Sequence, residues 1–390
     1  MKILVLSCNT GEGHNAAGRA IVEWAEKMGH EAVMEDMMLL AGKRASKMVG
    51  GTYVGIVQHV PRFFHLLYRL GGKLSSAYRR SPVYYANGLL AKPVLRYLQE
   101  HPVDIVITPH LFPAETLTYM KRKGMCQLPV LAVATDYTCI PFWEETRCDG
   151  YIIPHKDLVE EFMGRGIPKE KLFPIGIPVA PRFSQKEEMK RSRTLCGLPV
   201  DGRAFLIMGG SMGFGKIHLF VAELLRRRQA GDSVVIICGN NKKLQKTLNR
   251  LFGGMERVFI LGFTREVSRY MDACDVIFTK PGGLTSTEAA AKGIPIVHTN
   301  PIPGCETANV RFFTKKGMSL SARKIQEQLQ AGEKLLHEKN RENMLLTQRE
   351  NIHGESAAVL IKLAEKMVKE NQSEIVVDSR GKLEREGEVL

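Results

Sequence analysis

Short apolar runs alternate with longer segments of helical periodicity along most of the chain. The first run, residues 2–8, ends in a glycine-rich turn, and residues 15–28 then have apolar side chains spaced to lie on one helical face. Further apolar runs of strand length occupy residues 31–34, 104–108, 130–134 and 150–153. Strands that alternate with helices in this way predict a parallel sheet covered by helices.

A second series of the same kind begins after residue 200. Its apolar runs are residues 204–208, 234–238, 258–261, 276–279 and 294–298, and the first is followed by the glycine-rich turn 209–213. A proline-rich stretch at residues 176–185 separates the two series. The pattern predicts an α/β protein with two doubly wound, Rossmann-like domains at residues 1–178 and 179–365, and a charged C-terminal tail at residues 366–390.

Composition agrees with two folded domains. The 390 residues are 44% apolar, which is enough for two cores. The eight cysteines form no CxxC pair and no zinc-binding spacing, so we expect reduced thiols and no metal site. No apolar stretch has the length that crosses a bilayer or the pattern of a signal peptide, so we expect a cytoplasmic protein that is peripheral on the inner face of the cell membrane.

Positive charge is concentrated in one window of the chain. The net charge is +14, and residues 37–99, which lack Asp and Glu altogether, supply +10 of it. Cations stand beside aromatic and aliphatic side chains there, notably at Arg62, Phe63, Phe64, Arg69, Arg79 and Arg80. Rings settle at the level of lipid headgroups while Arg meets lipid phosphate, so we predict that residues 49–97 within this window dock on anionic membrane lipids. The alternative is a packed apolar layer under a solvated basic face.

The first glycine-rich turn permits two interpretations. Residues 11–16 fit the G-x-G-x-x-A form of the dinucleotide fingerprint, and Glu35 and Asp36 follow about 20 residues later, where a ribose-binding acid is expected. A dehydrogenase is therefore one hypothesis. His14, however, lies in the first turn of the predicted helix, where side chains face the ligand crevice of an open α/β sheet. An imidazole there suits a general base, although it could also only cap or pack the turn.

The second domain has the stronger nucleotide signature. Residues 279–290 follow a predicted strand, and Gly282 and Gly283 come after a proline at the start of a helix. Glycine amides and a helix N-terminus together bind phosphate. Glu288 lies one helical turn further on, where a carboxylate can accept hydrogen bonds from a ribose diol. A structural turn with a surface Glu is the alternative interpretation.

The run of residues 279–309 resembles the sugar-nucleotide site of GT-B glycosyltransferases. It is most similar to the diacylglycerol glycosyltransferases related to monogalactosyldiacylglycerol synthase and the processive diacylglycerol glucosyltransferases. The lipid II synthase that adds N-acetylglucosamine is among the wider relatives. The resemblance extends over about residues 1–365 and includes residues 11–17, Thr135-Asp136, and residues 176–178, 209–213 and 261–263.

The resemblance implies two Rossmann-like domains that face a central cleft, and inverting transfer of a hexose from a UDP-sugar to diacylglycerol. It implies that His14 activates the acceptor hydroxyl, with Asp136 as a second catalytic residue, and that the basic segment admits the lipid acceptor. The residues implied to bind the UDP-sugar are Gly13, Gly210, Ser211, Phe263, Gly282, Gly283, Thr285, Glu288, Glu306 and Asn309. Phe263 would lie against uracil, Glu288 would hold the ribose, and Glu306 and Asn309 would face the sugar or diphosphate. No cofactor or metal is expected, because helix ends and backbone amides stabilise the leaving diphosphate in such enzymes.

Two positions depart from the pattern of the family. Cys305 stands where many relatives have Gln, and Ile140 stands where some have a histidine. The alternative functions are a UDP-N-acetylglucosamine-dependent lipid II-type transferase or a sugar-nucleotide epimerase on the same scaffold. A nucleic-acid binder is not expected, because the positive charge is interleaved with aliphatic residues and no nucleic-acid module is present.

Overall fold

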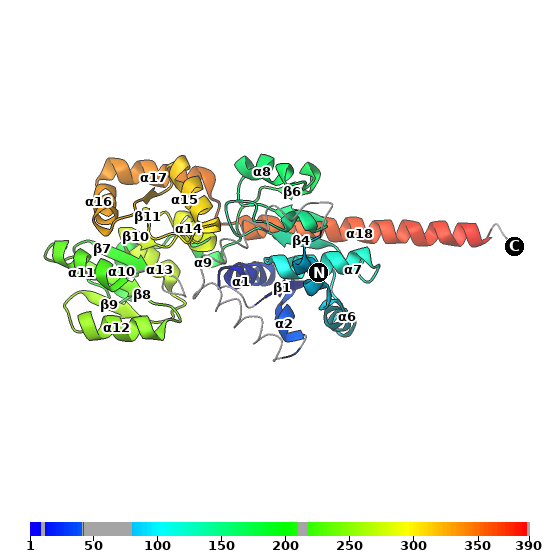
Figure 1. The fold of residues 1–390 in the computed structure, drawn as a ribbon, viewed down its shortest axis with the longest axis horizontal. Helices are drawn as coiled ribbons and strands as arrows, with labels where there is room; N and C mark the ends of the chain where they lie inside the picture. Colours follow the sequence, from blue (N-terminus) through cyan, green and yellow to red (C-terminus); the bar gives the residue numbers. More distant parts are fainter. Residues whose placement is uncertain (9–11, 41, 43–79, 210–216, 388–390) are drawn as a thin grey trace. The chain divides into compact units, whose positions relative to one another are not determined.

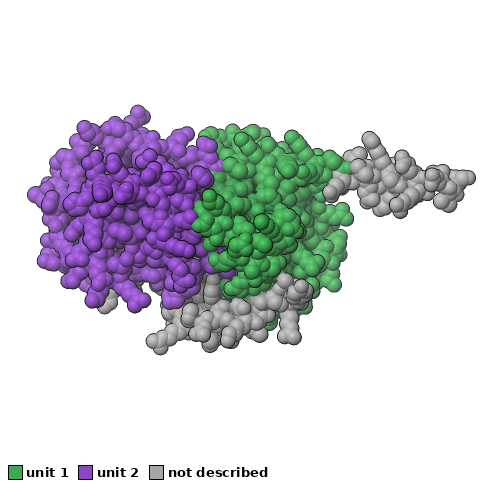
Figure 2. All heavy atoms as spheres, turned by 90° about the horizontal axis from the view of Figure 1, so that it is seen from above, with its two compact units in different colours: residues 1–134, 141–178, 356–390 green, residues 135–140, 179–355 purple. Residues whose placement is uncertain are grey.

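The chain forms two compact units (Figure 2). A computed structural model describes residues 1–8, 12–40, 42, 80–209 and 217–387. Unit 1 comprises residues 1–134, 141–178 and 356–390, and unit 2 comprises residues 135–140 and 179–355. These units differ from the predicted division of the chain at two segments, because residues 135–140 pack within unit 2 and residues 356–365 pack within unit 1.

Unit 1 is built on a six-stranded parallel sheet with the strand order β2-β1-β3-β4-β5-β6 (Figure 1). Its strands are β1 (Lys2–Ser7), β2 (Glu31–Asp36), β3 (Ile105–Thr108), β4 (Val130–Val133), β5 (Gly150–Ile152) and β6 (Leu172–Phe173). Residues 3–6 of β1 are all buried, as expected for a parallel sheet that is covered on both faces. The order reverses between β1 and β3, which is the topological switch point of this sheet.

Helices cover the sheet of unit 1. They are α1 (Glu12–Lys27), α2 (Met37–Leu40), α5 (Pro82–Gly88), α6 (Ala91–Glu100), α7 (Leu111–Arg122), α8 (Val159–Gly164) and α18 (Ser356–Gly387). Helix α18 returns from the far end of the sequence because Leu360, Ile361, Ala364 and Val368 lie at helical spacing and complete the core that β1 and α1 begin. This long-range packing explains why residues 356–365 belong to unit 1.

Unit 2 is built on a second six-stranded parallel sheet, with the order β12-β11-β10-β7-β8-β9. Its strands are β7 (Ala204–Met208), β8 (Ser233–Ile237), β9 (Val258–Leu261), β10 (Val276–Thr279), β11 (Ile296–His298) and β12 (Leu320–Ser321). Its helices are α9 (Pro181–Ser184), α10 (Met189–Leu195), α11 (Ile217–Arg227), α12 (Lys242–Phe252), α13 (Val267–Ala273), α14 (Gly283–Lys292), α15 (Cys305–Lys316), α16 (Ile325–Leu335) and α17 (Glu338–Asn351). The switch point lies between β7 and β10, so the predicted pair of doubly wound α/β folds is confirmed.

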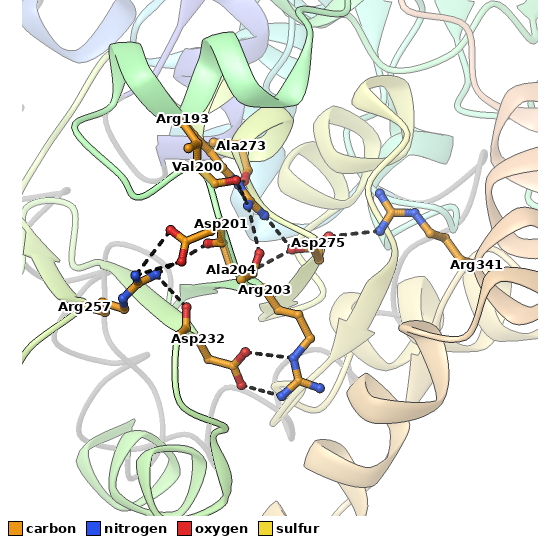
Figure 3. A network of polar contacts seen from close by, with 12 residues as sticks. Arg193, Val200, Asp201, Arg203, Ala204, Asp232, Arg257, Ala273, Asp275 and Arg341 are labelled. Atoms are coloured by element: carbon orange, nitrogen blue, oxygen red, sulfur yellow. Dashed lines mark hydrogen bonds and ion pairs between the residues drawn. The ribbon is translucent and has the colours of Figure 1, made fainter.

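Ionic contacts fasten the amino edge of the second sheet (Figure 3). Arg193 is 4% exposed, donates to the carbonyl oxygens of Ala273, Val200 and Gly202, and pairs with Asp275 at 2.9 Å. The same Asp275 oxygen accepts a hydrogen bond of 2.8 Å from the amide of Ala204, the first residue of β7. A buried charge is tolerated when it is paired and hydrogen-bonded, and Arg193 has one ion pair and three carbonyl acceptors. The amino ends of β7 and β10 are therefore held together, opposite the edge where the glycine turns lie.

A buried carboxyl group joins α5 to α7 in unit 1. Glu115 is fully buried on α7 and accepts a hydrogen bond from the side-chain amide of Asn87 on α5. The hydroxyl of Thr116 donates to the carbonyl oxygen of Asn87 at 2.9 Å and strengthens the same junction. Burial, assisted by the charges of Glu145 and Glu144 and opposed by the Asn87 hydrogen bond, raises the pKa of Glu115 from 4.5 to about 8. Glu115 is therefore protonated in the folded protein at neutral pH.

This protonation makes the stability of unit 1 depend on pH. The folded state keeps the Glu115 proton up to a pKa of about 8, whereas the unfolded chain loses it near 4.5, so stability falls as pH rises through that window. The slope should approach about 1.4 kcal/mol per pH unit. Glu115→Gln should remove this slope and be at least as stable as wild type at pH 8 in thermal melts. The matched control Glu160→Gln, at an exposed position, should keep the slope. Equal slopes in all three proteins would contradict the assignment.

Candidate active site

In unit 2, the residues predicted to hold the donor gather at the carboxyl edge of the sheet. Strand β10 ends at Thr279, and Gly282 is the N-cap of α14 with φ −68° and ψ 138°. No side chain caps this helix start in the described part of the chain, so its first amides remain available to an anion. Thr285 and Glu288 lie three residues apart on α14, which places them on one side of the helix, and both are partly exposed.

Phe263 follows β9 on the same edge. Its side chain is 64% exposed, an unusual position for a large aromatic residue. An exposed ring beside a nucleotide site can stack on a base. Gly210 and Ser211, predicted to approach the diphosphate, lie outside the described residues.

Residues 281–283 before α14 form the turn that is predicted to hold the donor, called the donor turn below, and segment 135–140 brings an acidic side chain to it. Asn309 is fully buried on α15, and its side-chain nitrogen donates to Asp136 at 2.8 Å and to the carbonyl oxygen of Pro281 at 3.0 Å. The oxygen of the same amide accepts from the backbone N–H of Tyr137 at 2.7 Å. The donors and acceptors around this amide therefore fix its orientation.

Tyr137 anchors the segment. Its ring is stacked on Phe312 at a centroid distance of 4.7 Å and meets the edge of Phe313 at 4.9 Å. The Thr287 hydroxyl donates to the carbonyl oxygen of Gly283 at 2.7 Å, so it accepts from the Tyr137 hydroxyl at 2.8 Å. Aromatic packing and this hydrogen-bond chain explain why the segment belongs to unit 2.

A buried ion pair stands directly before the donor turn. Lys280 lies 2.5 Å from one carboxylate oxygen of Glu306, and the other oxygen accepts from the amide of Ile302 at 2.8 Å. Burial raises the pKa of Glu306, and the ammonium of Lys280 opposes that shift. Both Glu306 oxygens thus have partners within the protein. Burial, followed by the charges of Asp136 and Glu306, also raises the pKa of the Cys305 thiol well above its usual range, so this thiol is neutral at pH 7.

In unit 1, His14 lies in the first turn of α1, as predicted, at the switch point between β1 and β3. Its Nδ1 lies 3.0 Å from the carbonyl oxygen of Pro109. A carbonyl can only accept, so Nδ1 carries the proton and Nε2 is the basic nitrogen of the ring. Gly13 precedes His14, and a side chain at that position would meet no atom within 4 Å among the described residues.

His110 is a neighbour of His14 that is not among the predicted site residues. The two ring centroids lie 4.7 Å apart in an edge-to-face arrangement. Burial lowers the pKa of His110 well below its usual range, and His14 lowers it further. Its Nδ1 accepts from the amide of Phe112 at 3.1 Å, so its proton is on Nε2. His110 follows β3 by two residues, and its place at the carboxyl end of a predicted parallel strand is the signal that could have identified it.

Most of the residues predicted to dock on a membrane lie outside the described part of the chain. Arg62, Phe63, Phe64, Arg69 and Arg79 lie outside the described residues. Arg80 is exposed, and its guanidinium lies 5.4 Å from the ring centroid of Tyr84. Among the described residues, no helix has the length and apolarity to span a membrane, and no group of His, Cys, Asp and Glu side chains is arranged to hold a metal ion.

Both halves of the chain match family models of glycosyltransferases. Residues 14–179 match the model of monogalactosyldiacylglycerol (MGDG) synthase, and residues 206–351 match that of glycosyl transferases group 1. A processive diacylglycerol beta-glucosyltransferase of Staphylococcus carnosus (strain TM300) is 26% identical over 343 residues, which are 87% of this chain and 85% of the relative.

Solved structures share the fold over nearly the whole chain. MurG of Acinetobacter baumannii has a TM-score of 0.60 at 15% identity, covering 94% of this chain and 99% of its own. A putative UDP-N-acetylglucosamine 2-epimerase of Listeria monocytogenes has a TM-score of 0.62 at 14% identity, covering 95% and 97%. At such identities the likeness concerns the fold alone.

The two glycines of the donor turn should respond differently to substitution. A methyl group on Gly283 would overlap the carbonyl oxygen of Thr135, whereas one on Gly282 would meet no atom within 4 Å among the described residues. Gly283→Ala should therefore destabilise the protein by about 1–3 kcal/mol, the usual cost of overpacking, and Gly282→Ala should change stability far less. Urea denaturation of both variants compares them, and equal destabilisation would show that segment 135–140 does not pack on Gly283.

The matches to both halves show a glycosyltransferase that is similar to the monogalactosyldiacylglycerol synthase model over residues 14–179 and to processive diacylglycerol beta-glucosyltransferases over most of its length.

Proposed function

We propose that this protein transfers a hexose from a UDP-sugar to diacylglycerol. The match of residues 14–179 to the MGDG synthase model supports this acceptor most directly, because the fold alone is shared with MurG and with epimerases. The donor turn at the start of α14 supports a nucleotide diphosphate as the leaving group.

The proposed function can be tested with a panel of donors. The protein is incubated with diacylglycerol and UDP-glucose, UDP-galactose or UDP-N-acetylglucosamine, and the lipid products are identified by mass spectrometry. A hexosyl-diacylglycerol product is expected. UDP release without any glycolipid, transfer only to a polyprenyl diphosphate-linked acceptor, or epimerised UDP-N-acetylglucosamine would each contradict the proposal.

His14 is proposed as the general base of an inverting displacement. Its Nε2 takes the proton from the acceptor hydroxyl while that oxygen forms a bond to the anomeric carbon. The bond from the anomeric carbon to the diphosphate oxygen breaks, and UDP leaves with the electron pair. The position of His14 at the switch point and the Pro109 carbonyl that fixes its tautomer support this role.

Removing this base should act on turnover. His14→Ala is expected to lower kcat by roughly 10²- to 10⁴-fold, the usual contribution of general-base catalysis, with UDP affinity unchanged. Steady-state kinetics and calorimetry with UDP measure the two quantities. A kcat within about threefold of wild type would exclude the role.

In unit 2, Gly282 and Gly283 are proposed to meet the diphosphate, Thr285 and Glu288 to face the nucleotide, and Phe263 to stack on uracil. Amides at the start of α14 would stabilise the charge that develops on the leaving group, as a metal ion does in other transferases. Turnover should then be unaffected by EDTA, and its loss on chelation would overturn a metal-free mechanism.

Glu288 is proposed to accept hydrogen bonds from the donor ribose, because it stands one turn beyond the glycine pair. Glu288→Ala should weaken UDP binding by about 1.5–3 kcal/mol, the scale of hydrogen bonds to a charged group. Isothermal calorimetry measures this loss, and an unchanged Kd would rule the role out.

The basic segment is proposed to dock the protein on anionic lipids at the inner face of the cell membrane. The single-sign charge of residues 37–99 and the aromatic residues among it support the proposal. Replacing Arg62, Arg69, Arg79 and Arg80 together by Ser should sharply reduce sedimentation with phosphatidylglycerol vesicles and leave UDP affinity intact. Equal sedimentation of variant and wild type at low salt would contradict docking, and a large loss of thermal stability would favour a packed segment instead.

A further inference from the structure

The buried amide of Asn309 holds together two chain segments that are distant in sequence. Its nitrogen donates to both Asp136 and the Pro281 carbonyl oxygen, and its oxygen accepts from the Tyr137 amide. Both N–H groups of the amide and one of the two lone pairs of its oxygen are thus used within the protein. A side chain with these contacts is better suited to positioning neighbouring groups than to gripping a sugar itself.

The group that Asn309 positions is the carboxylate of Asp136. One oxygen of Asp136 accepts the Asn309 hydrogen bond, and the carboxylate is partly exposed beside the donor turn. Its second oxygen has no hydrogen bond from any residue that the structure describes. Because Asn309 also donates to the Pro281 carbonyl oxygen, it holds the Asp136 carboxylate and the donor turn in a fixed arrangement.

Glu306, one turn before Asn309 on α15, holds the side chain of Lys280 in a similar way. It binds the ammonium of Lys280 with one oxygen and the Ile302 amide with the other. Residues 306 and 309 are three apart, so they lie on the same side of α15. Two side chains on one side of α15 therefore hold Lys280, the Pro281 carbonyl and Asp136 in place.

We propose that Asn309 is a positioning residue of the donor site, which orients Asp136 so that its second oxygen accepts a hydrogen bond from a hydroxyl group of the bound UDP-sugar. This inference rests on the proposed function, because it needs a UDP-sugar at the donor turn. It assigns Asn309 an indirect role, in contrast to the direct sugar contact that the family resemblance implies.

An isosteric substitution provides the test. Asn309→Asp keeps the shape and the acceptor for Tyr137 but replaces the donor nitrogen by oxygen, so two carboxylates then face each other at high pH. At lower pH one of them takes up a proton and can donate to the other, which restores the hydrogen bond. The other titratable groups that face this site, Lys280, Glu306, Cys305 and the Tyr137 hydroxyl, are the same in wild type and variant.

The measurement is the affinity for UDP-glucose by calorimetry between pH 5.5 and 8.5, which requires no lipid acceptor. Asn309→Asp should bind about 10-fold or more weakly than wild type at pH 8.5 and recover most of that loss at pH 5.5. The matched control Asn343→Asp, at an exposed position on α17, should follow wild type at every pH. A second variant that combines Asp136→Asn with Asn309→Asp has only one carboxylate in the pair formed by positions 136 and 309, as wild type does, so its affinity should not vary with pH relative to wild type.

The outcomes separate this inference from the proposed function. If wild type binds none of the UDP-sugars at any pH, the proposed function fails and this inference fails with it. If wild type binds but Asn309→Asp shows wild-type affinity, or a loss that is constant with pH, Asn309 does not act through the charge of Asp136. Asn309→Asp could also fail to fold. If the added Asp136→Asn then restores folding, repulsion between the carboxylates at positions 136 and 309 is supported, and if it does not, the inference is overturned.

Discussion

The arrangement of parallel strands around a switch point is the constraint on which both halves of this protein depend. Crossover helices leave adjacent strands toward opposite faces of the sheet at such a point, and the polar ends of the strands line the opening between them. In unit 1 this point lies between β1 and β3, and it receives His14 and His110. In unit 2 it lies between β7 and β10, and it receives the donor turn before α14.

The two edges of the second sheet are specialised by their chemistry. At the amino edge, the buried Arg193 pairs with the partly buried Asp275, and both are hydrogen-bonded to the backbone, which ties β7 to β10. At the carboxyl edge, the backbone is held through Asn309 and Thr287, and no side chain among the described residues caps the start of α14. The polar groups of both edges are therefore held in place by contacts within the protein, which is the condition that preorganised electrostatic catalysis requires.

The sequence predicted the fold where burial leaves a local pattern. The apolar runs at residues 104–108 and 276–279 became β3 and β10 with boundaries shifted by at most one residue, because strands buried on both faces have nearly continuous apolar sequences. The two-residue strands β6 and β12 were missed because they are too short for a periodic signal.

The sequence pattern did not predict which distant segments pack together. The return of α18 to the first core depends on a shape that forms only when distant segments meet, and so does the placement of residues 135–140 in unit 2. For the site, residue types beside glycine turns indicated His14 and Glu288. Three features of the site depend on contacts between residues that are distant in sequence, so no local sequence pattern predicts them. They are the tautomer of His14, the pairing of Lys280 with Glu306 and the hydrogen bond from Asn309 to Asp136.

We propose that the nucleotide binds at the turn of Gly282 and Gly283 and that proton transfer takes place at the turn of residues 11–14. A crystal structure of the protein with UDP tests it most directly, because both turns could hold a phosphate. The diphosphate is expected on the amides of Gly282 and Gly283, the ribose at Glu288 and the uracil against Phe263. A diphosphate bound at residues 11–14, with the turn before α14 unoccupied, would contradict the account and restore the dinucleotide-binding interpretation.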